Sequence, residues 1–298
     1  MIITHTEVPL TRNQKLIVVP IGDIHYNASS CDQDRFAETI KWIAETSKRP
    51  DRKVVTILMG DYLDTFSRSE RARLSFGTGL HESTHEWFEK QVQTNILELY
   101  NAIKPIKHTI GCVLAGNHTY KFQERAMKTL VGKTSDMYLA ELLEAPFMGM
   151  CGVYVLNLAS GSARFPFKIF MHHGFGSSSS KPSSVKQLLD LRAKFPAMNL
   201  YIMGHNHVKI CTTQEGIDVR FNNKSGEWRM VSLVQGFLRS ASFLKGYVEG
   251  EVVDGYSGSY AEEKCLAPAS LGVVSANIRL KVNKDTNQAD GYVLHVQE

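Results

Sequence analysis

The 298-residue sequence predicts an α/β layered fold with a β-rich C-terminal part. Through the first two-thirds of the chain, short β-branched runs alternate with helical apolar stripes, which is typical of strands joined by helices. From Val208 onward, short apolar runs are separated by Gly, Asn and Ser, which indicates further strands. Because no linker separates these parts, we expect a single domain over 1–298, with a motif-bearing core over 15–212 and a β-rich extension over 213–298.

Five apolar runs in the core are short enough to be buried strands. They are Leu16–Ile21, Val54–Met59, Thr109–Leu114, Phe167–Met171 and Leu200–Met203. The runs of the tail are Val219–Phe221, Trp228–Val234, Val273–Leu280 and Gly291–Val296.

Apolar side chains at helical spacing predict helices between these strands. The stripes consist of Phe36, Ile40, Ile43 and Ser47; of Phe88, Val92, Ile96, Leu99 and Ile103, ended by Pro105; of Tyr138, Leu142 and Leu143; and of Leu188, Leu189 and Arg192. The small-residue segment Gly174–Ser184 and the Gly- and Tyr-rich segment Gly246–Glu262 are expected to be long loops.

The composition bounds the class of protein. With 43% hydrophobic residues the chain can bury an ordinary core, and a formal net charge of +4 neither requires nor forbids nucleic acid as a partner. Five cysteines without a C-x-x-C pair argue against a disulfide framework or a cysteine zinc site and favour a reducing compartment. Met1–Lys15 lacks the apolar segment of a signal peptide. The apolar runs of the sequence are too short to span a membrane, so we expect a cytoplasmic protein without membrane partners.

Polar residues come after each of the five predicted core strands, with a glycine beside them. They are Asp23 and His25, Asp61 and Asp64, Asn117 and His118, His172 and His173, and His205 and His207. In open α/β sheets the carboxyl ends of the strands border one crevice, so these side chains are expected to converge there. Carboxylate, imidazole and amide oxygen are all metal ligands. One strand-terminal polar residue is usually a cap, but five such groups in series indicate a metal site.

This series resembles the calcineurin-like metallophosphoesterase superfamily, and within it the bacterial and phage branch described as repair-exonuclease-like. The family pattern D-x-H, G-D-x-x-D, G-N-H, H before Gly and G-H-x-H occurs here in order from Asp23 to His207. The resemblance implies a four-layer αββα sandwich with two metal ions in a cleft at the strand ends. The β-rich tail would then complete the second sheet.

The resemblance also implies which residues hold the two ions. Asp23, His25, Asp61 and His207 would bind the first ion, and Asp61, Asn117, His173 and His205 the second, with Asp61 bridging. His172 stays an alternative to His173, although the family ligand directly precedes Gly, which favours His173. Mixed N and O ligands suit manganese, iron, zinc or nickel, with manganese favoured. Such a pair of ions lowers the pKa of a bridging water, so that a hydroxide attacks phosphorus near neutral pH.

His118 is the residue that the resemblance makes catalytic. It would contact the phosphate or protonate the leaving oxygen, and Asp64 would orient it. Two positions depart from the family. An acidic residue often comes after G-N-H and supports the loop, whereas this chain has Thr119, so a substitute contact must exist. Thr65 and Phe66 stand where the Ser/Thr protein-phosphatase branch has Arg-Gly, which argues against that activity.

The expected function is that of a dinuclear metal-dependent phosphodiesterase acting on DNA, other nucleic acid or nucleotides. A phosphomonoesterase or protein phosphatase is the alternative. His81 and His85 form a literal H-E-x-x-H, but the segment lacks a third ligand and apolar packing, so a zinc protease is a remote alternative, as is a non-catalytic binding module. Arg68, Arg71 and Arg73 either steer phosphate or lie on a solvated helix face, and the isolated Arg239 is expected to be structural.

Overall fold

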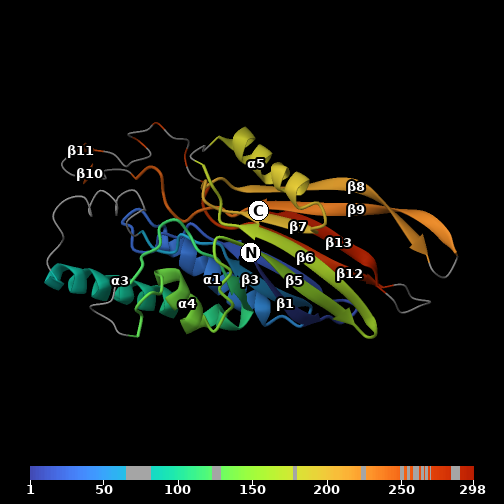
Figure 1. Cartoon of the computed structure of the whole chain (residues 1–298), viewed down its shortest axis with the longest axis horizontal. Helices are drawn as coiled ribbons and strands as arrows, with labels where there is room; N and C mark the ends of the chain where they lie inside the picture. Colours follow the sequence, from blue (N-terminus) through green and yellow to red (C-terminus); the bar gives the residue numbers. More distant parts are fainter. Residues whose placement is uncertain are drawn as a thin grey trace.

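The computed structural model describes residues 1–64, 82–122, 129–176, 180–222, 226–248, 252–253, 256–257, 262, 265, 268, 270–282 and 289–298. Two stacked sheets lie between helices on their outer faces, which is the expected αββα sandwich (Figure 1). No helix in the described part of the chain is long and apolar enough to span a membrane.

The first sheet has the strand order β1-β5-β6-β7-β9-β8. Its strands are β1 (Ile2–Pro9), β5 (Cys151–Ser160), β6 (Ala163–His172), β7 (Leu200–Met203), β8 (Ile210–Asn222) and β9 (Glu227–Arg239). The neighbours β6, β7 and β9 run parallel, so they end at the same edge. This edge is one wall of the candidate site.

The second sheet has the order β13-β12-β2-β3-β4. Its strands are β2 (Lys15–Ile21), β3 (Arg52–Leu58), β4 (Ile110–Val113), β12 (Ser275–Val282) and β13 (Ala289–Gln297). The strands β2, β3 and β4 are parallel, and β12 from the tail pairs with β2 in antiparallel fashion. The tail therefore completes this sheet, as the resemblance implied.

In the described part of the chain, five helical segments connect or cover the sheets: α1 (Gln33–Ser47), α3 (Glu82–Ile103), the 3₁₀ helix η1 (Lys104–Thr109), α4 (Ser135–Leu143) and α5 (Lys181–Lys194). The helices α1, α3 and α4 pack on the second sheet through residues such as Phe36, Ile96 and Leu139. The outer face of the first sheet receives α5 through Leu188 and Leu191. Between the sheets, alternate strand residues such as Val18, Ile57 and Ile169 form a third, fully buried cluster.

Several sequence expectations need correction. The strands β1 and β5 were not predicted, because the exposed β1 lacks a regular apolar alternation and β5 mixes small and polar residues among its apolar ones. The expected loop Gly174–Ser184 already contains the start of α5 at Lys181, a helix with proline in its first turn. Within the expected loop Gly246–Glu262, the short strands β10 (Val252–Val253) and β11 (Tyr256–Ser257) form an antiparallel pair.

Candidate metal centre

The five polar groups lie at the carboxyl ends of β2, β3, β4, β6 and β7. Backbone hydrogen bonds join the loops that carry them. The N–H of Asp23 donates to the carbonyl of Gly60 at 3.0 Å, and the N–H of His25 donates to the carbonyl of Asp61 at 3.1 Å. The two sheets thereby bring side chains from distant parts of the sequence to one edge.

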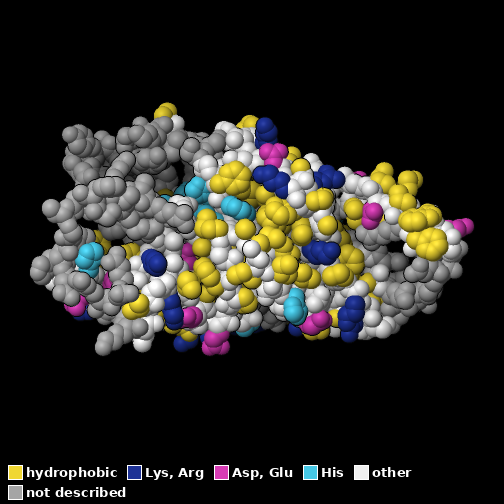
Figure 2. Space-filling model, viewed as in Figure 1, with side chains coloured by type: hydrophobic (Ala, Val, Ile, Leu, Met, Phe, Trp, Pro, Cys, Tyr) yellow, Lys and Arg dark blue, Asp and Glu magenta, His cyan; other side chains and the backbone are white. Residues whose placement is uncertain are grey.

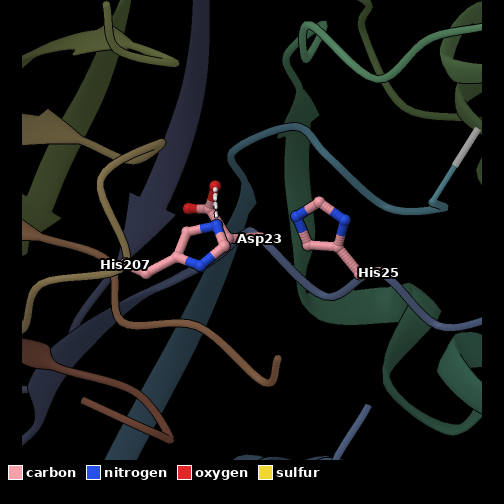
Figure 3. Close-up of side chains that lie close together, drawn as sticks. All are labelled: Asp23, His25 and His207. Carbon is pink, nitrogen blue, oxygen red and sulfur yellow. Dashed lines mark ion pairs between the residues drawn. The ribbon is translucent and has the colours of Figure 1, made fainter. Parts of the chain in front are cut away.

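The first cluster consists of Asp23, His25 and His207, whose ligand atoms lie within 4.8 Å of one another. Figure 3 shows the His207 ring against the Asp23 carboxylate, with His25 on the other side of the group. His207 Nε2 lies 3.6 Å from Asp23 Oδ1. These are three of the four residues that the resemblance assigned to the first ion.

The second cluster consists of Asp61, His173 and His205, again with ligand atoms within 4.8 Å. His173 Nε2 lies 3.3 Å from Asp61 Oδ2 and 2.9 Å from Asn117 Oδ1. The other carboxylate oxygen of Asp61 accepts the backbone N–H of His118 at 2.9 Å. All four residues assigned to the second ion thus lie together, whereas the bridging role of Asp61 stays a prediction.

His118 and Asp64 form a third group with His25. His118 Nδ1 lies 3.2 Å from Asp64 Oδ1, and His25 Nδ1 lies 3.4 Å from the same atom. Hydrogen bonds from His118 and His25 lower the pKa of Asp64. An ionised Asp64 is therefore in place to orient His118, as an acid that protonates a leaving group requires.

The backbone at this edge is strained. Seven of the described non-glycine residues have a left-handed φ. Five of these belong to the two clusters and have φ between 48° and 76°: Asp23, His25, Asp61, His205 and His207. Each such residue costs on the order of 1–3 kcal/mol and persists where its surroundings fix it, which is typical of functional sites. The strained turns bring these side chains together at one edge of the sheets.

Two glycines permit the close approach of the loops. A Cβ at Gly116 would collide with Asp61, and a Cβ at Gly60, where φ is +99°, would lie 2.6 Å from His173 Nδ1. The space for the ligand side chains therefore depends on glycine at these positions.

Buried imidazole nitrogens without a hydrogen-bond partner show that the two clusters fit a metal centre. Within the described part of the chain, His25 Nε2 and His205 Nδ1 are buried and have no hydrogen-bond partner. A buried polar atom without a partner costs about 1–3 kcal/mol unless something binds it. Each cluster contains one such nitrogen beside a carboxylate, which is a donor set that suits a divalent transition metal.

Burial and charge set the protonation of the clusters. Burial raises the pKa of Asp23 to about 6. Burial alone would lower the pKa of His173, but the adjacent Asp61 carboxylate outweighs this effect and raises it to about 9. Reciprocally, His173 outweighs the effect of burial on Asp61 and lowers the pKa of that carboxyl. Without a metal, a proton on His173 therefore balances Asp61, and a bound cation would replace it.

The geometry separates His172 from His173. His173 is fully buried, and its Nδ1 contacts the carbonyl of Met59 at 2.8 Å while Nε2 faces the second cluster. The ring of His172 turns away, accepts the N–H of Gly174 at 2.8 Å and packs edge-on against Phe175. Successive strand residues point to opposite faces, so only His173 joins the cluster.

Sequence reasoning missed Asp136, a buried residue in the first turn of α4. Its carboxylate accepts the N–H of Gly116 at 2.8 Å and the hydroxyl of Ser135 at 3.0 Å. Ser135 Oγ in turn accepts the N–H of Tyr120 at 3.0 Å and lies 3.1 Å from Thr119 Oγ1. This network is the substitute contact that Thr119 made necessary. In the sequence, Thr134-Ser135-Asp136 is an ordinary signal for the start of a helix, so it does not single out Asp136 as a residue of the site.

Arg239 is structural, but it supports the site loop. It is fully buried, and its guanidinium donates to the carbonyl of Gly204 at 2.8 Å and to Gln187 Oε1 at 3.0 Å. Gly204 begins the loop that carries His205 and His207. Arg239 at the end of β9, bonded also to Gln187 of α5, therefore stabilises the position of this loop.

Several candidate residues lie outside the described part of the chain, namely Arg68, Arg71, Arg73 and His81. His85 is half-buried in α3. In the described residues it belongs to none of the three metal-type groups.

The fold is an αββα sandwich with paired His/Asp clusters of metal-ligand type at one edge. The family model of calcineurin-like phosphoesterases matches residues 17–209. The chain therefore belongs to the calcineurin-like phosphoesterase family, and it is a metal-dependent phosphoester hydrolase in general. No curated protein sequence matches the chain.

Solved structures of other proteins match the chain at low sequence identity. A conserved protein from Streptococcus pneumoniae TIGR4, described as a predicted phosphoesterase, is 13% identical with a TM-score of 0.31, covering 95% of this chain and 98% of that one. The inner-membrane-complex anchor GAP50 of Plasmodium is 10% identical with a TM-score of 0.43, covering 96% and 90%. A 5'-nucleotidase precursor from Thermus thermophilus is 12% identical with a TM-score of 0.32, covering 95% and 54%.

Proposed function

We propose that this phosphoesterase is a phosphodiesterase that uses two divalent metal ions, manganese favoured, to hydrolyse nucleic acid or nucleotides. The observation that carries the proposal is the pair of His/Asp clusters, each with one buried imidazole nitrogen that has no partner in the described residues. Asp23, His25 and His207 would hold one ion, and Asn117, His173 and His205 the other, with Asp61 between them. When bound, the two ions supply an activated water and neutralise charge on the phosphoryl oxygens.

The residues of the chain provide the rest of the chemistry. Asp64, ionised and 3.2 Å from His118 Nδ1, holds that ring so that Nε2 is directed away from the carboxylate. His118 would donate a proton from Nε2 to the oxygen of the leaving group as the ester bond breaks. The backbone N–H of His118 donates to Asp61 Oδ1, and this bond would keep His118 at a constant position relative to the second cluster.

The diester preference rests on the two residues directly after Asp64. Thr65 and Phe66 replace the Arg-Gly of the protein-phosphatase branch, so an arginine that would grip the terminal oxygens of a monoester is missing at that point of the sequence. A phosphodiester presents one charge less and needs no such clamp. The net charge of +4 is compatible with a polyanionic substrate.

The test is hydrolysis by purified protein of a chromogenic phosphodiester, the matching phosphomonoester and single-stranded DNA, with added manganese over roughly pH 6 to 9. We expect turnover of the diester above that of the monoester. A preference for the monoester would reject the phosphodiesterase assignment. Absence of any manganese-dependent turnover would reject catalysis altogether and favour a binding module.

A further inference from the structure

The strands β8 and β9 extend beyond the sandwich as a two-stranded ribbon. They pair along their whole length, from Ile210 with Arg239 to Asn222 with Glu227. The neighbouring β7 reaches only residues 236–239 of β9, so the rest of β9 has β8 as its single partner strand among the described residues. In Figure 1 the ribbon forms one end of the molecule, opposite α3.

The two faces of this ribbon differ. On one face, α5 contacts the ribbon, where Arg192 donates to Gln214 Oε1 at 2.7 Å. The other face is the inner face of the sheet. Nearer the metal centre, residues of this face such as Cys211 and Leu238 pack in the core between the two sheets. Five large apolar side chains occupy this second face: Ile217, Val219, Phe221, Trp228 and Met230.

These five residues, the ribbon face, are unusually exposed. Their exposed fractions run from 48% for Phe221 to 78% for Met230. The register sets Val219 opposite Met230 and Phe221 opposite Trp228, so the five form one continuous stripe. Figure 2 shows hydrophobic side chains gathered at this end of the molecule. A core-type face that no described residue covers indicates an interaction surface.

We propose that the ribbon face packs against the same face of a second copy, forming a two-fold dimer. The area agrees with this partner. With about 200 Å² for a large side chain and an average exposure of about two-thirds, the five residues present on the order of 600 Å². Two copies would bury on the order of 1,200 Å², which reaches the lower end of stable protein interfaces.

The charge pattern favours an identical partner. In a two-fold interface a residue close to the axis meets its own copy, so a charge at the centre of the interface would face a like charge. The five apolar positions and the adjacent Ser232, which pairs with Ile217, carry no charge. The face is therefore self-compatible, and nothing in it selects an oppositely charged partner.

The dimer leaves the metal centre free. Met230 lies nine residues before Arg239, which ends β9 at the site, and a strand rises about 3.3 Å per residue, so the two are about 30 Å apart. Loss of the dimer is therefore expected to leave hydrolysis of a small substrate unchanged. For the same reason, the dimer does not depend on the proposed diesterase activity.

The experiment is analytical ultracentrifugation of the full chain over a range of concentrations. We expect a monomer–dimer equilibrium that Val219→Lys weakens by roughly ten-fold or more. The matched control is Ile3→Lys. Ile3 is 67% exposed on β1, the opposite edge strand of the same sheet, and this variant should dimerise like the wild type. Thermal unfolding of each variant checks that it is folded.

A mixing experiment tests the two-fold contact itself. Val219 belongs to the middle pair of the stripe, so in a two-fold contact centred on the stripe it lies close to its own copy. Val219→Lys and Val219→Glu should therefore each be monomeric, and an equimolar mixture should regain a dimer because opposite charges then lie close together. A wild-type protein that stays monomeric, or a dimer that Val219→Lys leaves intact, would overturn the proposal. So would a monomer whose ribbon face instead binds lipid vesicles.

Discussion

The buried carboxylate of Asp136 accepts the backbone N–H of Gly116 at 2.8 Å. Gly116 directly precedes Asn117, so this bond ties the start of α4 to the loop that carries Asn117 and His118. Asp136 does not belong to any of the metal-type groups of the described residues. It acts on the site through the backbone and is a positioning residue.

Replacement of Asp136 by Ala should reduce turnover by roughly ten-fold or more, because loop displacement of about 1 Å already costs that much or more. KM should change less than kcat, since the loop carries His118, the proposed acid. The matched control is Ser135→Ala, which removes the neighbouring hydroxyl but keeps the carboxylate, and it should have a smaller effect. Equal losses in both variants, or an unchanged kcat in Asp136→Ala, would contradict the positioning role.

Asp136 should also make the stability of the metal-free protein depend on pH. Burial raises the pKa of this carboxyl from 3.8 to about 7, so between these values the native state keeps a proton that the unfolded chain releases. The stabilisation is therefore complete below about pH 4 and is lost as the pH rises towards 7. Denaturant unfolding of wild type and Asp136→Asn should show a difference in free energy that changes over this range. A difference independent of pH would mean that Asp136 titrates normally.

His118→Ala should lower kcat by about 10²- to 10⁴-fold, the usual contribution of an acid in such a step. Both metal ions should stay bound, because His118 contacts Asp64 and Asp61 and is no member of the two ligand clusters. Metal analysis of the purified variant checks this. Loss of an ion would show that His118 is a ligand instead.

Asp61→Asn should abolish high-affinity binding of metal, since the carboxylate lies 3.3 Å from His173 Nε2 and is the proposed bridge. His85→Ala serves as the control for the H-E-x-x-H alternative and should bind metal like the wild type. Calorimetric titration with manganese and zinc separates the two hypotheses. Loss of zinc binding in His85→Ala alone would favour the protease-type site.

Arg239→Met should destabilise the protein by about 1–3 kcal/mol, because the buried hydrogen bonds from the guanidinium to the carbonyl of Gly204 and to Gln187 Oε1 would be lost. Arg239→Lys keeps the charge but not the fork that also reaches Gln187, so it should restore only part of the stability. Chemical denaturation measures both. A variant as stable as the wild type would show that the guanidinium holds nothing in the loop.

The core strands and the helices that cover them could be predicted because each has a local signature. The run Val54–Met59 is apolar on both faces, as a strand between two layers must be, and the stripe from Phe88 to Ile103 has helical spacing ended near Pro105. The strand β1 has no such signature. It is an exposed edge strand, and only its pairing with β5 makes it a strand.

The sequence by itself predicted the chemistry of the site, because the residue types and their order after each strand indicate a set of metal ligands and an acid. The tertiary structure decided which of His172 and His173 faces the site, which contacts Thr119 makes, and which apolar residues of the described chain are exposed. Those outcomes depend on contacts between segments that are distant in the chain. Asp136 and Gly116 are 20 residues apart, and no local pattern encodes a hydrogen bond between them.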